Sequence, residues 1–227
     1  MRRVFSNGPS KDYVIKPFQA MAQKASRIHV AAPYVTKTDD LVEAARAGKF
    51  VDLLVGLNAS TSPQALTAAQ GIPNLAVRYL TRRFHAKIYM FDDTAMVGSS
   101  NLTDGGLMSN REATICFDQP EDGNAIEELR SLFLELWDSA LVLTPEKLRE
   151  FTTAYASIKR SGPDPDVLIE QAVGKAEPVN INVASAAKSR QASVPGRAPQ
   201  TGIRAIPACL HRSDQPPSGR QLPARRA

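Results

Sequence analysis

The feature that most constrains the fold is a pair of short apolar runs, residues 86–91 and 95–100, joined by the polar sequence DDT at residues 92–94. Runs of this length on either side of an Asp-rich turn predict a β-hairpin. Polar side chains lie within and beside these apolar runs. The register of the hairpin therefore determines which polar side chains face each other across it.

Four of these polar side chains are expected to converge. Side chains alternate between the two faces of a strand, so His85 and Lys87 share one face of the first strand. Ser99 and Asn101 likewise share one face of the second. A turn centred on Asp93 places Asn101 opposite His85. The same turn places Ser99 opposite Lys87, with Cβ atoms about 5 Å apart in each pair. A shift of one residue would scatter the four groups.

These residue types suit the chemistry of a phosphodiester. A neutral imidazole such as that of His85 is a good nucleophile near neutral pH, and its attack on phosphorus gives a phosphohistidine. Lys87 and Asn101 can donate to the non-bridging oxygens as charge builds on them, and Ser99 can add another donor. Glu112 is the nearest downstream carboxylate that can accept from the ring and fix its tautomer.

The pattern resembles the HxKxxxxD and GSxN signature of the phospholipase D superfamily. The matching residues are His85, Lys87, Asp92, Gly98, Ser99 and Asn101. The sequence Asn110-Arg111-Glu112 resembles the NxE element of the small bacterial endonucleases of that superfamily. One spacing departs from the pattern, because five residues separate Asp92 from Gly98 where the family has six. This spacing predicts a turn that is one residue tighter.

The resemblance implies an α/β fold with a mixed β-sheet flanked by helices on both faces. It also implies a histidine nucleophile that needs no metal or cofactor, and a site built from two copies of the motif, the second histidine being the general acid. This chain has one copy, since neither His29 nor His211 is followed by a lysine two residues later. The resemblance therefore implies a homodimer joined through the active-site face.

Several assignments have an alternative. Asp92 either forms a hydrogen bond in the active site or caps the turn through its own backbone. Glu112 either orients the imidazole or is an ordinary charge on an edge strand. The basic residues that precede the motif, Arg78, Arg82 and Arg83, either steer a phosphate backbone or belong to a solvated loop face.

The rest of residues 1–160 alternates between helical and extended patterns, which is typical of an α/β domain. Helices are expected at residues 13–25, 39–47, 62–70, 124–139 and 145–157. Besides the hairpin, strands are expected at residues 27–32, 51–56, 75–80 and 112–117. We therefore assign residues 1–160 to one phospholipase D-like catalytic domain.

Residues 161–227 differ in composition. They have no aromatic residue and hold nine of the sixteen prolines, and such a sequence cannot bury enough apolar surface to offset the entropy of ordering. We expect a disordered tail rich in Pro, Ala and Arg. Lys and Arg exceed Asp and Glu by 19 to 18 in residues 1–160 and by 9 to 5 in the tail, so most of the net charge of +5 belongs to the tail.

The sequence gives no indication of export or of a metal centre. Residues 1–16 lack the apolar core of a signal peptide, and no run is long enough to cross a membrane. Cys116 and Cys209 do not form a disulfide framework, and no Cys/His spacing suggests zinc. We expect a cytoplasmic protein without membrane contact, metal or cofactor.

Three functions are compatible with these features. The first is a metal-independent phosphodiesterase that cleaves DNA, in restriction or repair, because cytoplasmic single-motif relatives generally cleave nucleic acid. The second is a phospholipid-hydrolysing enzyme of the phospholipase D type, which the single motif and the lack of a membrane-binding helix disfavour. The third is a non-catalytic module for dimerisation or nucleic-acid binding, which the intact His85, Lys87 and Asn101 disfavour.

Overall fold

The computed structural model describes the backbone of residues 3–160 and the side chains of residues 3–156. The predicted tail at residues 161–227 lies outside the described residues. The strands are β1 (Arg3–Phe5), β2 (Arg27–Ala32), β3 (Phe50–Gly56), β4 (Leu75–Leu80), β5 (Ile88–Phe91), β6 (Thr94–Gly98), β7 (Thr114–Asp118) and β8 (Leu141–Val142). The helices are α1 (Ile15–Lys24), α2 (Asp39–Arg46), α3 (Pro63–Ala69), the π-helical turn η1 (Gly105–Ser109), α4 (Gly123–Ser139) and α5 (Pro145–Arg160). Over residues 3–160, no helix combines the length and apolar character that crossing a bilayer requires.

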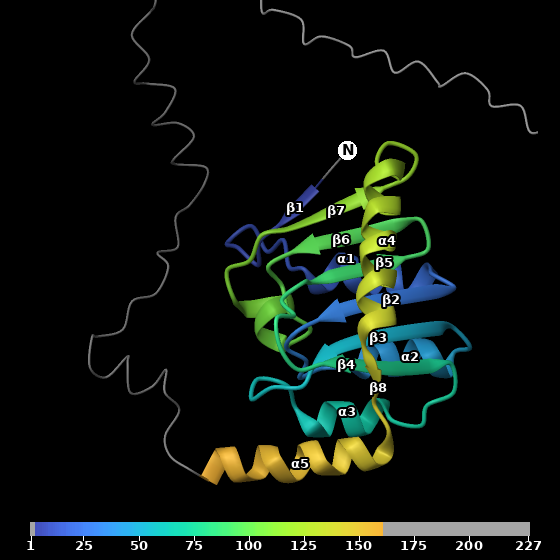
Figure 1. Cartoon of the computed structure of the whole chain (residues 1–227). Coiled ribbons are helices and arrows are strands. Elements are labelled where there is room, and N and C mark those ends of the chain that lie inside the picture. Colours follow the sequence, from blue (N-terminus) through green and yellow to red (C-terminus); the bar gives the residue numbers. More distant parts are fainter. Residues whose placement is uncertain (1–2, 161–227) are drawn as a thin grey trace, which may run out of the picture. The chain divides into compact units, whose positions relative to one another are not determined.

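The eight strands form one mixed sheet in the order β1-β7-β6-β5-β2-β3-β4-β8. Neighbours β2, β3 and β4 are parallel, whereas β5 pairs antiparallel with β2 and continues into antiparallel β6 and β7 (Figure 1). The carboxyl ends of β2, β3, β4 and β6 therefore meet the amino ends of β5 and β7 at one edge of the sheet.

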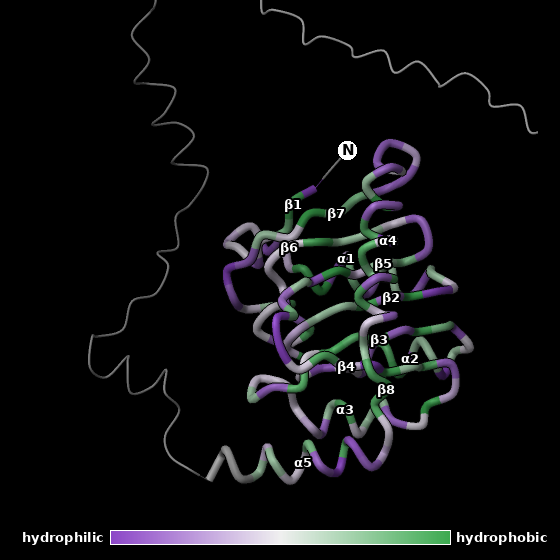
Figure 2. The backbone as a smooth tube through the Cα atoms, viewed as in Figure 1, coloured by the Kyte–Doolittle hydropathy of each residue, from purple (hydrophilic) through white to green (hydrophobic). Residues whose placement is uncertain are grey.

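Both faces of the sheet are covered by helices, as predicted. Figure 1 shows α4 across one face and α1 and α2 behind the other, with α3 below β4 and next to α5. The alternation along β2 explains this, since Ile28, Val30 and Ala32 belong to the larger apolar core, whereas Ala31 belongs to the core beneath α4. Figure 2 shows the same separation, with hydrophobic strands inside and hydrophilic connections around them.

Aromatic contacts connect the central strands to their helices. Phe18 of α1 lies edge-on to Tyr89 and Phe91 of β5, with ring centroids 5.7 Å and 5.5 Å away. On the other face, Phe133 of α4 lies 4.8 Å from the ring of His29. His29 thus has the core role that a histidine inside an apolar strand more often has, and its Nδ1 lies 3.0 Å from the Asp52 carboxylate.

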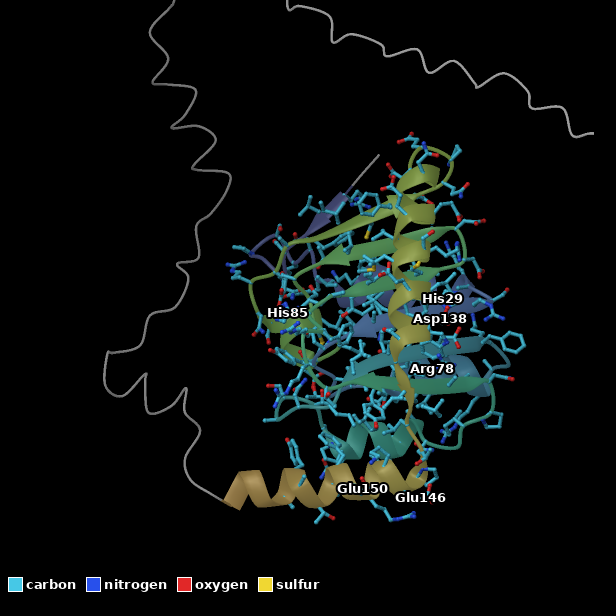
Figure 3. The ribbon with its side chains drawn as sticks, viewed as in Figure 1. His29, Arg78, His85, Asp138, Glu146 and Glu150 are labelled. Atoms are coloured by element: carbon cyan, nitrogen blue, oxygen red, sulfur yellow. The ribbon has the colours of Figure 1, made fainter. Side chains whose placement is uncertain are left out.

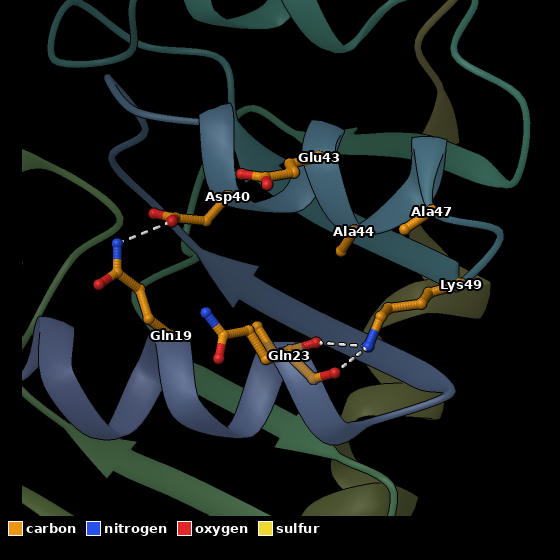
Figure 4. A pocket seen from close by; sticks show the side chains of 8 residues that line it. Gln19, Gln23, Asp40, Glu43, Ala44, Ala47 and Lys49 are labelled. Atoms are coloured by element: carbon orange, nitrogen blue, oxygen red, sulfur yellow. Dashed lines mark hydrogen bonds between the residues drawn. The ribbon is translucent and has the colours of Figure 1, made fainter.

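A lysine closes the carboxyl end of α1. The Lys49 ammonium donates to the carbonyl oxygens of Ala22, Gln23 and Ala25 at 2.9 Å, 2.5 Å and 2.8 Å (Figure 4). The last carbonyls of a helix lack hydrogen-bond partners within the helix and carry partial negative charge. The Lys49 ammonium donates hydrogen bonds to these carbonyls and offsets their negative charge. The hollow of about 340 Å³ between α1 and α2 is lined by this lysine, whose hydrogen bonds hold the end of α1 in place.

The register of the β5–β6 hairpin differs by one residue from the prediction. Ile88 pairs with Val97 and Phe91 with Thr94, so the turn has two residues, Asp92 and Asp93. Asp92 adopts a left-handed φ of 48°, which a two-residue hairpin turn requires and Asp tolerates. The short motif spacing predicts this tighter turn. The centre of the turn lies at the peptide bond between Asp92 and Asp93, and not at Asp93 as predicted.

The shift makes the predicted pairing of His85 with Asn101 and of Lys87 with Ser99 wrong. Paired strand structure also stops earlier than predicted, at Ile88 and at Gly98. The four polar residues consequently lie in the segments that enter β5 and leave β6, and not on the paired strands themselves.

Asp92 lies at the opposite end of β5 from His85. Its carboxylate accepts hydrogen bonds from the backbone N–H groups of Ser26 at 2.7 Å and Arg27 at 2.9 Å, and its own N–H donates to the Arg27 carbonyl. Neither predicted alternative describes this arrangement. Asp92 lies away from His85, so its placement in the active site is wrong, and its carboxylate binds the backbone of Ser26 and Arg27 and not the backbone of its own turn. Asp92 fastens the hairpin turn to the first residues of β2.

Replacing Asp92 with alanine should destabilise the fold. Two backbone donors lose their acceptor, which costs about 1–3 kcal/mol in the free energy of unfolding. Asp93→Ala is the matched control, because Asp93 is an exposed residue of the same turn and should change stability by less than about 0.5 kcal/mol. Urea unfolding followed by circular dichroism measures both. Equal losses for the two variants would contradict this role of the Asp92 carboxylate.

Candidate active site

The motif residues gather at the edge of the sheet where the carboxyl ends of β2, β3 and β4 lie. Lys87 directly precedes β5, Ser99 directly follows β6, and Glu112 lies two residues before β7. His85, labelled in Figure 3, lies at this edge, whereas His29 is labelled beneath α4. Five of the six predicted site residues are thus at one end of the sheet, and Asp92 is at the other.

His85 and Lys87 are in direct contact. The Lys87 ammonium lies 3.1 Å from Nδ1 of His85 and donates to the His85 carbonyl at 3.0 Å. An ammonium can only donate, so this contact assigns the lone pair to Nδ1 and the ring proton to Nε2. The Tyr34 ring stands edge-on to the imidazole, with centroids 6.0 Å apart.

Lys87 is a desolvated cation. Only 6% of its surface is exposed, and this burial lowers the pKa of its ammonium below the ordinary lysine value, while the charge of Glu112 opposes the shift. A buried ammonium close to the imidazole can stabilise an anion strongly, because little water screens it.

Glu112 bonds to Ser99 and not to His85 within the described part of one chain. The Ser99 hydroxyl donates to the Glu112 carboxylate and accepts from the Ala113 N–H at 2.9 Å. The predicted contact between Glu112 and the imidazole is therefore not formed in the single chain. Glu112 acts here on Lys87 through its charge and on Ser99 through a hydrogen bond.

Two glycines allow the backbone to pack closely around Asn101. A Cβ on Gly98 would lie 2.1 Å from the Ala113 carbonyl oxygen, and one on Gly106 would lie 2.4 Å from the Asn101 carbonyl oxygen. The Asn101 side-chain Oδ1 is buried and has no hydrogen-bond partner among the described residues. The glycine of GSxN thus lets the end of β6 lie against β7, and Gly106 lets η1 lie against Asn101.

Sequence reasoning missed Tyr34 and Gly106. Tyr34 follows the carboxyl end of β2, and α/β sheets commonly place ligand-contacting residues at the carboxyl ends of strands. The predicted strand at residues 27–32 could therefore have indicated Tyr34 as a site residue. Gly106 lies in a Gly-Gly pair whose local sequence does not indicate the close approach to Asn101. Across residues 3–160, no group of three or more His, Cys, Asp or Glu side chains is arranged to hold a metal ion.

Comparisons with known proteins identify the fold and the family. A search of curated protein sequences returned no match. Among solved structures, NucT from Helicobacter pylori matches with a TM-score of 0.55 and 17% identity, over 63% of this chain and 99% of that one. Nuc from Salmonella typhimurium, a phospholipase D family member, matches with a TM-score of 0.53 and 19% identity, over 63% and 97% of the two chains.

These structural matches establish the fold. The family model described as "Cardiolipin synthase, PLD-like domain" matches residues 18–137, which include every predicted site residue. This match covers more than half of the sequence, and the chain therefore belongs to the phospholipase D superfamily.

Proposed function

We propose that the protein is a metal-independent phosphodiesterase that cleaves DNA through a phosphohistidine. The observation that carries the proposal is the contact between His85 and the buried Lys87, 3.1 Å apart, at the sheet edge that also holds Ser99 and Asn101. This arrangement provides a nucleophile, a desolvated cation and polar donors around one space, which are the groups that phosphoryl transfer needs.

The reaction has two steps. A substrate phosphate draws the Lys87 ammonium from Nδ1 of His85, the ring proton moves to Nδ1, and Nε2 attacks phosphorus. The bond from phosphorus to the leaving oxygen breaks, and a second histidine gives that oxygen a proton. Water then attacks phosphorus, the P–N bond breaks, and the second histidine takes the proton from the water. Lys87 and Asn101 stabilise the non-bridging oxygens in both steps.

The second histidine comes from a second copy of the chain. His29 is buried under Phe133 and cannot reach the sheet edge where His85 lies, and His211 is outside the described residues. A two-fold axis through the site would bring the partner's His85 to the same phosphate, and a homodimer is the simplest assembly with that symmetry.

DNA is favoured over a phospholipid by the charges near the site. Arg82 and Arg83 are exposed in the connection that leads from β4 to His85, and a polyanionic backbone meets such residues on either side of the scissile phosphate. A phospholipid carries a single phosphodiester and would use fewer of these cations.

The first prediction concerns the nucleophile. The wild-type protein should cleave DNA in excess EDTA, and His85→Ala should abolish cleavage while leaving the melting temperature unchanged, since a partly exposed side chain is removed. Single-stranded DNA, duplex DNA, RNA and phosphatidylcholine vesicles are compared as substrates. A strict requirement for Mg²⁺, or full activity of the His85→Ala protein, would show that the catalytic centre lies elsewhere.

The second prediction concerns the charge on Lys87. Lys87→Ala should lower kcat about 10²–10³-fold, the scale seen when a preorganised donor is removed. Lys87 must be protonated to act, so activity should be lost as pH rises through its lowered pKa. Glu112 holds that pKa up, and Glu112→Gln should therefore move the alkaline limb of the pH profile to lower pH.

Ser99→Ala is the control for this pH profile. It removes the hydroxyl that bonds to Glu112 but keeps the carboxylate charge, so the alkaline limb should move less than in the Glu112→Gln protein. An identical profile for wild-type and Glu112→Gln proteins would contradict the electrostatic link between Glu112 and Lys87.

The third prediction concerns the dimer. Light scattering should give twice the mass of one chain, and a purified mixed dimer of wild-type and His85→Ala chains should lose at least about 10²-fold in rate, because general acid catalysis contributes that much. Differently tagged chains allow the mixed dimer to be isolated. A mixed dimer with half of the wild-type activity, or an active monomer, would rule out the shared site.

A further inference from the structure

A second concave surface lies beside the catalytic edge. It is a hollow of about 390 Å³ between the loop at residues 6–13 and the segment that joins η1 to β7, with Lys11 and Tyr13 on one side and Met108 and Arg111 on the other. In Figure 1 this loop, drawn in dark blue, and the green turn of η1 lie at the edge of the sheet where β6 ends.

A backbone hydrogen bond joins the hollow to the catalytic edge. The N–H of Glu112 donates to the Ser6 carbonyl at 3.1 Å, at the point where the loop begins. Arg111, which lines the hollow, directly precedes Glu112 in the chain, and its guanidinium donates to the Asn7 carbonyl at 3.4 Å. Because Glu112 bonds to Ser99, the segment at residues 111–112 belongs to both the hollow and the catalytic edge.

The loop is held in one shape before any ligand arrives. The Asp12 carboxylate accepts from the N–H groups of Ser6 and Gly8, each at 3.0 Å, and from the hydroxyls of Ser6 and Ser10 at 2.9 Å and 2.8 Å. Burial alone would raise the pKa of Asp12, but the hydrogen bonds outweigh it and lower the pKa to about 2. The Asp12 carboxylate thus accepts its hydrogen bonds from within the loop.

A buried asparagine fixes this loop to the site. Asn7, 7% exposed, donates to the carbonyls of Gly106 and Asn110 at 3.0 Å each. Its Oδ1 accepts from the N–H of Val14 at 2.8 Å, ahead of α1. Because Gly106 lies against Asn101, the same contact couples the loop to a catalytic residue. Ligand binding here would cost little ordering entropy.

The hollow presents cations and one aromatic ring. Lys11 and Arg111 are exposed residues that line it, and Tyr13, which also lines it, is half-buried. Lys16 lies 5.4 Å above the Tyr13 ring and donates to the Lys11 carbonyl at 3.2 Å. Cations beside an aromatic face are the pattern with which proteins hold single-stranded nucleic acids, the cations on phosphates and the ring on a base.

We propose that this hollow binds the nucleotide next to the scissile phosphate of a single-stranded polynucleotide, with Lys11 and Arg111 on its phosphates and Tyr13 stacked on its base. The assignment rests on the proposed function and narrows its substrate class. A duplex keeps its bases stacked on each other and offers none to Tyr13. A lipid headgroup has no aromatic ring for Tyr13 to stack on.

The test is a binding measurement that needs no turnover. Full-length protein carrying His85→Ala, which should not cut its ligand, is titrated into a fluorescent single-stranded DNA oligonucleotide, an RNA of the same sequence, the duplex, and phosphatidylglycerol vesicles. Lys11→Gln and Tyr13→Ala are added to this background. Tyr13→Phe keeps the ring, and Lys24→Gln removes an equally exposed charge at the far end of α1.

Lys11→Gln and Tyr13→Ala should each weaken single-strand binding about tenfold, and Tyr13→Phe and Lys24→Gln by less than about twofold. The same order among variants in kcat/KM for the oligonucleotide, in proteins that retain His85, supports the assignment further. Lys11→Gln binding as tightly as Lys24→Gln would overturn it. Equal losses on the duplex, or losses confined to the vesicles, would also overturn it.

This result is separable from the proposed function. A wild-type protein that cleaves no phosphodiester, but whose Lys11→Gln and Tyr13→Ala variants bind single strands weakly, would refute catalysis and keep the subsite. A wild-type protein that cleaves DNA with variants that bind normally would keep catalysis and refute the subsite.

Discussion

The antiparallel pairing of β5 with β2 is the constraint on which the site depends. It joins a parallel β2–β3–β4 unit to the antiparallel β5–β6–β7 unit, and it brings the amino end of β5 to the carboxyl end of β2. His85 and Lys87, which precede β5, are thereby placed where the connections after β2, β3 and β4 end. A slip of one residue would carry Tyr89 and Phe91 away from Phe18 and into the face under α4, so core packing fixes the position of His85 and Lys87.

Much of this fold could be predicted from local patterns. The strands β2 and β4 and the ends of α4 follow from local patterns: β2 is a continuous apolar run, β4 alternates between buried and less buried residues, and α4 has helical apolar spacing. The hairpin was also predictable, and the short motif spacing indicated a tighter turn, but the exact register depended on the left-handed φ of Asp92. The N–H groups of Ser26 and Arg27, which bind the Asp92 carboxylate, are distant in sequence, so the turn sequence does not reveal them.

The parts of the site that escaped prediction are those built by contacts between distant segments. Strand β1 has only three residues and pairs with β7, more than a hundred residues away. No local sequence pattern therefore predicts this strand. Asn7 is held by carbonyls of η1 for the same reason. The bond of Glu112 to Ser99 could not be predicted from spacing, because it forms between the segments after β6 and before β7, which approach each other closely at Gly98.

The charge on Lys87 depends on a balance between burial, which disfavours the ammonium, and the nearby Glu112 carboxylate, which favours it. An ammonium removed from water costs free energy in the resting protein, and the pKa of Lys87 is lowered for that reason. Glu112 recovers part of the cost, but it also holds the Ser99 hydroxyl, so its carboxylate is shared between two groups. Under the proposed function, an entering phosphate offsets the remaining cost, because the anion faces a cation that little water screens. In that proposal, the desolvation of Lys87 favours the charge that builds on the phosphoryl oxygens toward the transition state.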